Sequence, residues 1–308
     1  MLSQTSRGKW LLTAAFDCKA KAMRQNCNRF TKHFHLNLSR PMVSVTSKKE
    51  DAPKKGTCIQ RPTRIILIRH GESLGNVDDS AYVATPDWKV PLTERGRQQS
   101  FDAGKELADI VGDGQVFFYY SPYKRTRATV DELLKHINKS QIISTREEPR
   151  ISEQQFGNFQ NVEQVWESKK ERHEFGRFYY RFKSGEAGLD VYSRVSSFIS
   201  TLVRDCQQYQ KAGYELDTVN VVIVTHGLSL RLFLMRWFQF GVEEFEATKN
   251  PDNAALVVMK KRCPPGGHRW YELDEKNREE LNLPEWCNVP KNVHLHSLLA
   301  DARLEGPS

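Results

Sequence analysis

The fold of this chain is indicated by the stretch Arg64-Ile65-Ile66-Leu67-Ile68-Arg69-His70-Gly71, in which four apolar residues lead directly to a basic residue, a histidine and a glycine. A continuous apolar run of this length is typical of a strand buried on both faces of a parallel sheet. A second run, residues 219–224, leads in the same way to Thr225-His226-Gly227. Ligands bind at the carboxyl ends of such strands, so two parallel neighbours would bring both histidines to one edge.

Strands and helices alternate along the rest of the main domain. We expect further strands near residues 116–120, 141–145 and 254–259. A helix should follow Leu92 with Thr93 as its N-cap, and further helices should cover residues 123–138, 190–210 and 228–240. This order predicts an α/β fold, a three-layer α/β/α sandwich around a mostly parallel sheet.

The chain divides into three parts by composition. Residues 1–60 should form a basic segment and linker without a packed core, residues 61–262 the main domain, and residues 263–308 a polar C-terminal extension. Up to Lys49 the first part has a single acidic residue, Asp17, and many hydroxyl side chains. This composition is typical of an organelle transit peptide, with a plastid preferred over a mitochondrion. A basic tail retained on a cytoplasmic protein is the alternative.

The positive charge of the chain is confined to the same N-terminal part. The formal net charge is +8, yet residues 1–60 carry 12 Lys or Arg against three Asp or Glu, which leaves 34 basic and 35 acidic residues for the remainder. The main domain therefore lacks a field that would attract a polyanion, and we expect no nucleic-acid partner. No apolar run approaches the roughly 18 residues of a membrane span, so we expect no membrane partner. The sequence leaves the oligomeric state open.

A third strand end adds positive charge to the predicted ligand edge. The strand at residues 116–120 is followed by Ser121-Pro122-Tyr123-Lys124-Arg125-Thr126-Arg127. Cations in the first turn of a helix oppose the helix macrodipole, so this turn indicates a bound anion that offsets them. A solvated basic turn is the alternative for this motif alone. Three strand ends of this kind in one sheet favour an anion site.

These motifs resemble the signature of the histidine phosphatase superfamily, in its phosphoglycerate-mutase-like branch. The resemblance covers about residues 64–260, and the similar motifs follow one another in the family's order. They are Arg69-His70-Gly71-Glu72-Ser73 with Asn76 after it, Pro91-Leu92-Thr93-Glu94-Arg95-Gly96, Ser121-Pro122-Tyr123-Lys124-Arg125-Thr126, Ile151-Ser152-Glu153-Gln154-Gln155-Phe156-Gly157, and Thr225-His226-Gly227. Five motifs in order make a chance match improbable.

The resemblance implies a metal-independent phosphohydrolase that acts on a small phosphorylated metabolite and needs no cofactor. His70 would attack phosphorus and become phosphohistidine, which requires the neutral imidazole that an ordinary pKa near 6.5 supplies at neutral pH. Arg69, Arg125 and His226 would surround the phosphate oxygens, as expected for a reaction that depends on positioning and charge stabilisation. Asn76 is a further phosphate-binding candidate.

Glu153 would protonate the leaving oxygen and later accept a proton from the attacking water. Neighbouring arginines favour the ionised carboxylate, so this role requires either that Glu153 is partly buried or that the bound substrate's charge keeps it protonated. A surface carboxylate in a loop is the alternative for Glu153. Glu72, by contrast, is expected to orient the loop.

Three features leave the substrate open. The segment Phe156-Gly157-Asn158-Phe159-Gln160 matches neither the phosphatase nor the mutase pattern of the branch. Residues 161–184 are aromatic and charged, and we expect a helical lid whose basic side chains either bind a second anionic group or form a solvated face. A phosphoglycerate mutase is therefore the alternative function, and a non-catalytic phospho-ligand-binding protein is a second one. Six cysteines without Cys-x-x-Cys spacing indicate reduced thiols.

Overall fold

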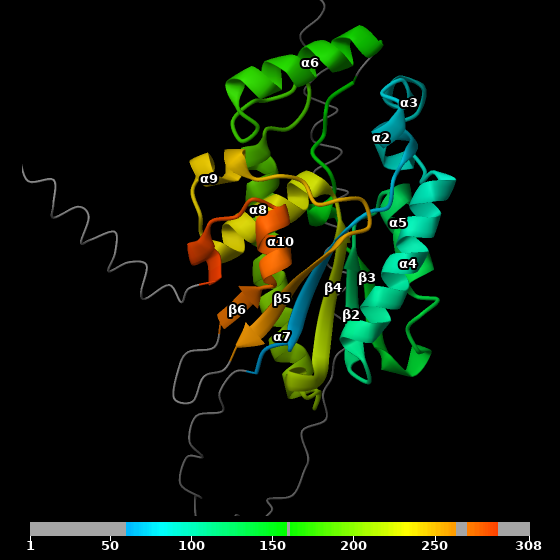
Figure 1. The fold of residues 1–308 in the computed structure, drawn as a ribbon, viewed down its shortest axis with the longest axis vertical. Helices are drawn as coiled ribbons and strands as arrows, with labels where there is room; N and C mark the ends of the chain where they lie inside the picture. Colours follow the sequence, from blue (N-terminus) through cyan, green and yellow to red (C-terminus); the bar gives the residue numbers. More distant parts are fainter. Residues whose placement is uncertain (1–59, 159–160, 263–269, 289–308) are drawn as a thin grey trace, which may run out of the picture. The chain divides into compact units, whose positions relative to one another are not determined.

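A six-stranded sheet forms the centre of the molecule in the computed structural model, which describes residues 60–158, 161–262 and 270–288 (Figure 1). The strand order is β3-β2-β4-β1-β5-β6. The strands are β1 (Arg64–Arg69), β2 (Gln115–Tyr120), β3 (Ile142–Glu147), β4 (Val219–Thr225), β5 (Leu256–Arg262) and β6 (Trp270–Leu273). Strands β1 to β4 pair in parallel, whereas β5 pairs antiparallel with both of its neighbours.

Side chains of the central strands alternate between two apolar cores, one on each face of the sheet. In β1, Ile65 and Leu67 belong to one core and Ile66 and Ile68 to the other, and all four are at most 2% exposed. Helices α7 (Gly188–Lys211) and α8 (Gly227–Phe238) contribute to the first core, and α4 (Glu94–Val111) and α5 (Lys124–Leu133) to the second. Burial of each such side chain contributes about 1.5–3 kcal/mol. The predicted α/β/α sandwich is confirmed.

The other helices of the described residues flank these layers. They are α2 (Leu74–Val77), α3 (Ala81–Ala84), α6 (Val162–Phe175), α9 (Val242–Ala247) and α10 (Glu275–Glu280), with 3-10 turns η1 (Asp87–Lys89), η2 (Lys139–Gln141), η3 (Pro149–Ile151), η4 (Leu216–Thr218) and η5 (Glu285–Asn288). Helix α6 falls within the predicted helical segment 161–184. Figure 1 shows it beyond the end of the sheet, across from α2 and α3. It therefore lies over the edge where the sequence placed the ligand.

The ends of several elements differ from the sequence prediction, and two of them make specific contacts. Helix α5 ends at Leu133 rather than near Asn138, and the chain then turns so that the His136 ring packs on Phe101 with a centroid separation of 4.4 Å. The last strand of the predicted domain starts at Leu256 rather than at Ala254. Ala254 has a φ of 62° and donates its backbone N–H to the carbonyls of Arg69 and His70. It thus contacts the site loop instead of extending the strand.

The sheet continues beyond residue 262, where the sequence analysis placed the end of the main domain. Strand β6 pairs with β5, and Tyr271 and Leu273 are each 3% exposed. The Tyr271 hydroxyl donates a hydrogen bond to the carbonyl of Pro62 at 2.5 Å. A short edge strand that buries alternate residues is easily read as polar sequence, because only half of its side chains are apolar.

Several sequence predictions fall on residues outside the described ranges. Residues 1–59, which hold almost all of the predicted transit peptide and linker, are among them, as are residues 263–269 and 289–308 of the C-terminal extension. Import into an organelle therefore stays a prediction. Within the described ranges, no helix is both long and apolar enough to cross a membrane. Cys206 and Cys287, which lie in these ranges, are free thiols.

Candidate active site

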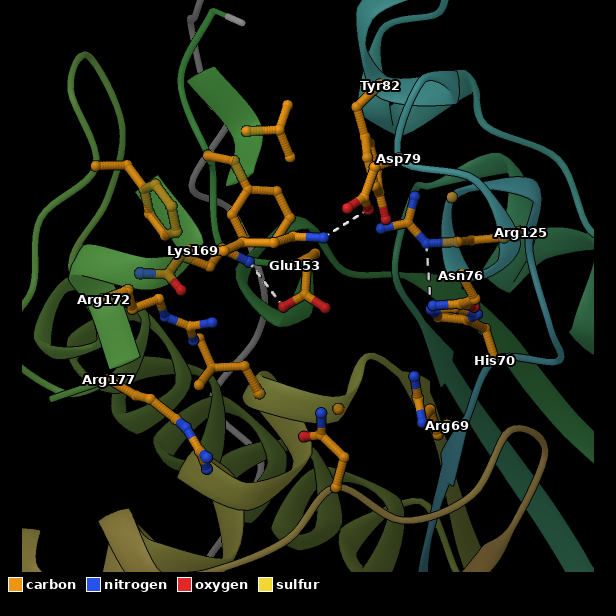
Figure 2. Close-up of a pocket in the computed structure, with 18 of the residues that line it drawn as sticks. Arg69, His70, Asn76, Asp79, Tyr82, Arg125, Glu153, Lys169, Arg172 and Arg177 are labelled. Carbon is orange, nitrogen blue, oxygen red and sulfur yellow. Dashed lines mark hydrogen bonds and ion pairs between the residues drawn. The ribbon is translucent and has the colours of Figure 1, made fainter. Parts of the chain in front are cut away.

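The predicted site residues converge at the carboxyl edge of the sheet. Strands β1 and β4 are parallel neighbours with Arg69 opposite Thr225, so His70 and His226 follow at the same level. Their ring centroids are 5.1 Å apart, with an interplanar angle of 65°. Arg125 comes from the first turn of α5, which follows β2. Figure 2 shows Arg69, His70 and Arg125 on one wall of a pocket.

The loop after β1 is fixed by close packing against the start of α4. A Cβ atom on Gly71 would lie 2.2 Å from the carbonyl oxygen of Gly96, so a larger residue cannot occupy this position without a shift. Thr93 caps α4, as predicted, by accepting the N–H of Gly96 at 2.9 Å. The Glu72 carboxylate accepts the Thr93 hydroxyl at 2.8 Å. Glu72 thus orients the loop and takes no part in lining the pocket.

Hydrogen bonds define the tautomer of His70. Its Nδ1 lies 2.7 Å from the carbonyl oxygen of Gly71, which can only accept, so Nδ1 carries the proton. Arg125 Nε donates to His70 Nε2 at 3.2 Å, so Nε2 holds a lone pair. Burial and, second, the Arg125 charge lower the pKa of His70 well below its usual value. The ring is therefore neutral, with Nε2 available as a nucleophile.

Two guanidinium groups are held beside this imidazole. Arg125 is 2% exposed, and its Nη1 donates to both the carbonyl and the carboxylate of Asp87 at 2.8 Å. Arg69 Nη1 donates to the Pro251 carbonyl at 2.7 Å, while its buried Nε has no partner among the described residues. Buried polar groups are normally hydrogen-bonded. The free Arg69 N–H thus fits an oxyanion that completes the site.

His226 has a second buried nitrogen atom without a hydrogen-bond partner among the described residues. Ser121 Oγ lies 2.8 Å from His226 Nε2 and accepts the backbone N–H of Tyr123 at 3.5 Å. If the Ser121 hydroxyl donates to Nε2, the His226 proton is on Nδ1. This Nδ1 is buried, has no hydrogen-bond partner in the described structure, and lies 4.0 Å from Glu153 Oε2. Burial is the main cause of a pKa well below the usual histidine value, so the ring is neutral, and in this tautomer Nδ1–H is a donor.

Glu153 faces the histidines across the pocket from its own loop. Its side chain is 14% exposed, and Oε1 accepts the N–H of Gln154 at 2.9 Å. Burial raises the pKa of Glu153 above its usual value and outweighs the opposing charge of Arg125. Partial burial was one of the two conditions that the sequence analysis gave for a general acid at this position, and Glu153 is buried in this way.

The loop that carries Glu153 is held by donors from two helices. Arg194 of α7 donates to the carbonyls of Arg150, Ser152 and Glu153 at 2.7–2.9 Å. It also pairs with the Glu186 carboxylate at 3.0 Å. Ser229 of α8 donates to the Ser152 carbonyl at 2.6 Å. These bonds fix the carboxyl group of Glu153 relative to the strand ends, which general acid catalysis requires.

Asn76 lines the pocket, but part of its side chain has a structural role. Its Oδ1 accepts the backbone N–H and the hydroxyl of Ser73, both at 3.0 Å. Asn253 donates to the same oxygen at 3.3 Å and to the His70 carbonyl at 3.1 Å. The oxygen of Asn76 is therefore committed to the loop. Its amide NH₂ group is the part that could contact a phosphate.

The pocket is large, polar and rich in cations. Its volume is about 870 Å³, and seven Lys or Arg against three Asp or Glu are found among the described residues that line it. Helix α6 closes one side, where Trp166 and Lys169 contact the Asp79 carboxylate from the segment between α2 and α3. No group of three His, Cys, Asp or Glu that could hold a metal ion occurs in the described ranges.

Sequence reasoning missed three arginine or aspartate residues of this pocket region. Asp87, which holds Arg125, lies in a stretch with no motif of its own. Arg194, which holds the acid loop, is an ordinary polar position of an amphipathic helix. Arg231 did have a signal, because it is a charged residue inside the apolar run of α8, Leu228–Met235, and is 3% exposed. Charged residues are almost never fully buried unless paired.

A neutral histidine beside buried guanidinium groups, with a second histidine and a buried carboxyl group of raised pKa nearby, is an arrangement that suits phosphoryl transfer. The sequence profile of the histidine phosphatase superfamily (branch 1) matches residues 65–268. The chain belongs to this superfamily.

Individual relatives are consistent with this assignment. The chain is 46% identical over 238 residues to the phosphoglycerate mutase-like protein AT74 of Arabidopsis thaliana, covering 75% of this chain and 74% of the relative. It is 28% identical to the broad-range acid phosphatase DET1 of Saccharomyces cerevisiae, covering 74% and 91%. Among solved structures, a mycobacterial hydrolase aligns with a TM-score of 0.55 at 21% identity, over 81% of this chain and 100% of that one. This last similarity shows the fold.

Proposed function

We propose that this protein is a metal-independent phosphohydrolase that removes the phosphoryl group of a small phosphorylated metabolite through a phosphohistidine at His70. The observation that carries the proposal is the pairing of a neutral His70, whose Nε2 lone pair adjoins Arg125, with a buried Glu153 whose pKa is raised. The nucleophile is thus neutral, and the pKa of the acid is shifted toward the protonated form that the first step needs.

In the first step, the Nε2 lone pair of His70 forms a bond to phosphorus as the ester P–O bond breaks. The leaving oxygen takes the proton of Glu153. Arg69, Arg125 and the free Nδ1–H of His226 stabilise the charge on the three terminal oxygens. These groups are preorganised by burial and by their hydrogen bonds, so they need little reorganisation during the reaction.

In the second step, water attacks the phosphohistidine. The Glu153 carboxylate, deprotonated in the first step, accepts the proton of this water. The N–P bond breaks, its electron pair returns to His70 Nε2, and inorganic phosphate is released. The site then has its starting protonation state.

A phosphotransferase of the phosphoglycerate mutase type is the second candidate. Relatives named phosphoglycerate mutase-like are 46% identical to this chain. The contacts of Trp166 and Lys169 with Asp79 join the two sides of the pocket, which favours retention of a bound acceptor. In a mutase, the phosphoryl group of His70 would pass to that acceptor instead of water.

Rapid quenching with a ³²P-labelled phosphate ester tests the proposal. Wild-type protein should carry acid-labile label, and the His70→Ala variant should carry none. His173→Ala is the matched control, because this exposed histidine of α6 does not line the pocket. Turnover by His70→Ala would refute the proposal, and binding without any phosphoenzyme would indicate a phospho-ligand-binding protein. Label that passes to an added acceptor, with or without 2,3-bisphosphoglycerate, rather than to water would favour the mutase.

A further inference from the structure

A second group of cations lines the pocket away from the phosphate site. It consists of Arg172 of α6, Arg177 in the turn after α6, and Arg231 of α8, which we call the distal arginine cluster. Figure 2 shows Arg172 and Arg177 on the wall opposite His70 and Arg125, with Glu153 between the two walls. The pocket thus has two cationic ends.

The distal arginine cluster lacks acidic partners. Among the ion pairs of the described residues, none involves Arg172, Arg177 or Arg231. The charges of Glu153 and Glu246 act on Arg172 and Arg231, but neither carboxylate forms an ion pair with them, and Glu246 Oε1 accepts the backbone N–H of Phe178 at 2.7 Å. Three cations are therefore grouped in a partly dry site without an acidic ion-pair partner among the described residues, an arrangement that costs free energy in the empty protein.

Arg231 provides the strongest evidence that this group is a binding site. It is 3% exposed, and its Nη1 donates to the carbonyl and hydroxyl oxygens of Thr248 at 3.2 and 3.1 Å. Its Nε is buried and has no partner among the described residues, although Arg231 lines the pocket. Burial, and then the charges of Arg177 and Arg172, lower the pKa of Arg231 to about 9.

A purely structural role explains only part of this arrangement. The Arg231 guanidinium lies 5.0 Å from the Phe245 ring centroid and the Arg172 guanidinium 5.7 Å from that of Phe182. These contacts leave Arg231 Nε without a hydrogen-bond partner among the described residues. Arg172 Nε is likewise buried and unpartnered in the described structure. Two adjacent arginines with unused buried donors match an oxyanion better than they match packing.

We propose that the distal arginine cluster binds a second phosphate group of the substrate, located on the alcohol half of the scissile ester. Glu153 lies between the two cationic ends, and as general acid it marks the side of the leaving oxygen. The group beyond Glu153 is therefore the alcohol that leaves. This inference rests on the proposed function, since it uses the position of the general acid.

A phosphate suits the distal arginine cluster better than a carboxylate does. A phosphate dianion has three terminal oxygens and two charges, whereas a carboxylate has two oxygens and one charge, which one guanidinium satisfies in a bidentate pair. Two guanidinium groups with unpartnered buried N–H donors, beside the third cation Arg177, therefore indicate the more highly charged ligand. The substrate class is a small metabolite with two phosphate esters separated by a short carbon chain.

The test compares butane-1,4-diol bisphosphate with butyl phosphate, which differ only in the second phosphate. Wild-type protein should have the higher kcat/KM for the bisphosphate. Arg172→Gln should reduce the ratio of the two kcat/KM values, bisphosphate over butyl phosphate, by roughly 10- to 100-fold, the range of a lost charge-assisted hydrogen bond. Lys170→Gln is the matched control, because it removes the same charge from α6 outside the pocket and should leave the ratio unchanged. Equal kcat/KM values for both esters in the wild type would overturn the inference.

A binding measurement separates failure of this inference from failure of the proposed function. Calorimetry on the His70→Ala variant needs no turnover, and the bisphosphate should bind more tightly than butyl phosphate. Adding Arg172→Gln to His70→Ala should remove most of that difference. Adding Arg231→Met instead should do the same, provided that cooperative thermal unfolding shows that this variant is folded. If no ester is hydrolysed but this difference is found, the proposed function fails and the distal site stands. Tighter binding of 4-phosphooxybutanoate than of the bisphosphate would overturn the assignment to phosphate.

Discussion

The role of Glu153 can be tested by the conservative substitution Glu153→Gln. Among the described residues, the carboxylate of Glu153 accepts one hydrogen bond, from Gln154 N–H at 2.9 Å, which a glutamine amide oxygen can accept equally well. Glutamine is also uncharged, as a protonated Glu153 is. We therefore expect the loop and the binding of substrate to be retained, so that the loss is confined to proton transfer.

Because the loss should be confined to proton transfer, the expected decrease in rate is that of a missing general acid. Loss of a general acid typically slows a reaction roughly 10²- to 10⁴-fold. At about 1.36 kcal/mol for each factor of ten, this corresponds to about 2.7–5.4 kcal/mol on the barrier of the first step. The full effect should be seen with an alkyl phosphate, whose leaving oxygen needs a proton. It should be much smaller with p-nitrophenyl phosphate, because p-nitrophenolate leaves without one.

Quench-flow measurement of phosphoenzyme with both esters is the appropriate assay. With p-nitrophenyl phosphate, the Glu153→Gln variant should form phosphohistidine quickly and hydrolyse it slowly, because water attack still needs a base, so the intermediate should accumulate. Glu72→Gln is the matched control, since this carboxylate contacts Thr93 rather than the pocket, and any effect should be the same for both esters. Equal slowing of Glu153→Gln with both esters, without accumulation, would show that Glu153 is neither acid nor base.

Two further predictions concern charge and pH. Arg125→Met should lower kcat roughly 10²- to 10³-fold with p-nitrophenyl phosphate, as expected for loss of one preorganised donor. It should also reduce the free energy of unfolding by at most about 3–5 kcal/mol, because Asp87 loses its buried partner. Adding Asp87→Asn should restore stability without restoring kcat, and recovery of both would contradict a catalytic role for Arg125. In the pH dependence, His70 should remain neutral below pH 6.5, because its pKa is lowered. The protonated form of Glu153 should be lost as pH rises through the raised pKa of this group. The kcat/KM for an alkyl phosphate should therefore be highest on the acid side of neutrality. A decline at high pH that survives Glu153→Gln would assign that ionisation to another group.

Most of the site could be predicted because its residues follow strands. His70 and His226 come directly after apolar runs that form β1 and β4, and Arg125 begins the helix after β2. Parallel strands end at one edge, so a local pattern is sufficient to predict that these residues meet. The edge strand of the sheet was less predictable. Strand β6 is short and half-buried, and its pairing with β5 is a long-range choice.

The sequence by itself determined the fold class, the family and the order of the chemical groups along the chain, because apolar periodicity and strand-end motifs are local properties. Only the tertiary structure decided the state of those groups. Burial raises the pKa of Glu153, and Asp87 holds Arg125, through contacts between segments that no local pattern connects. The distal arginine cluster likewise joins α6 to α8 across the pocket. Burial and charge proximity depend on where distant segments pack, so they emerge only when the chain is folded.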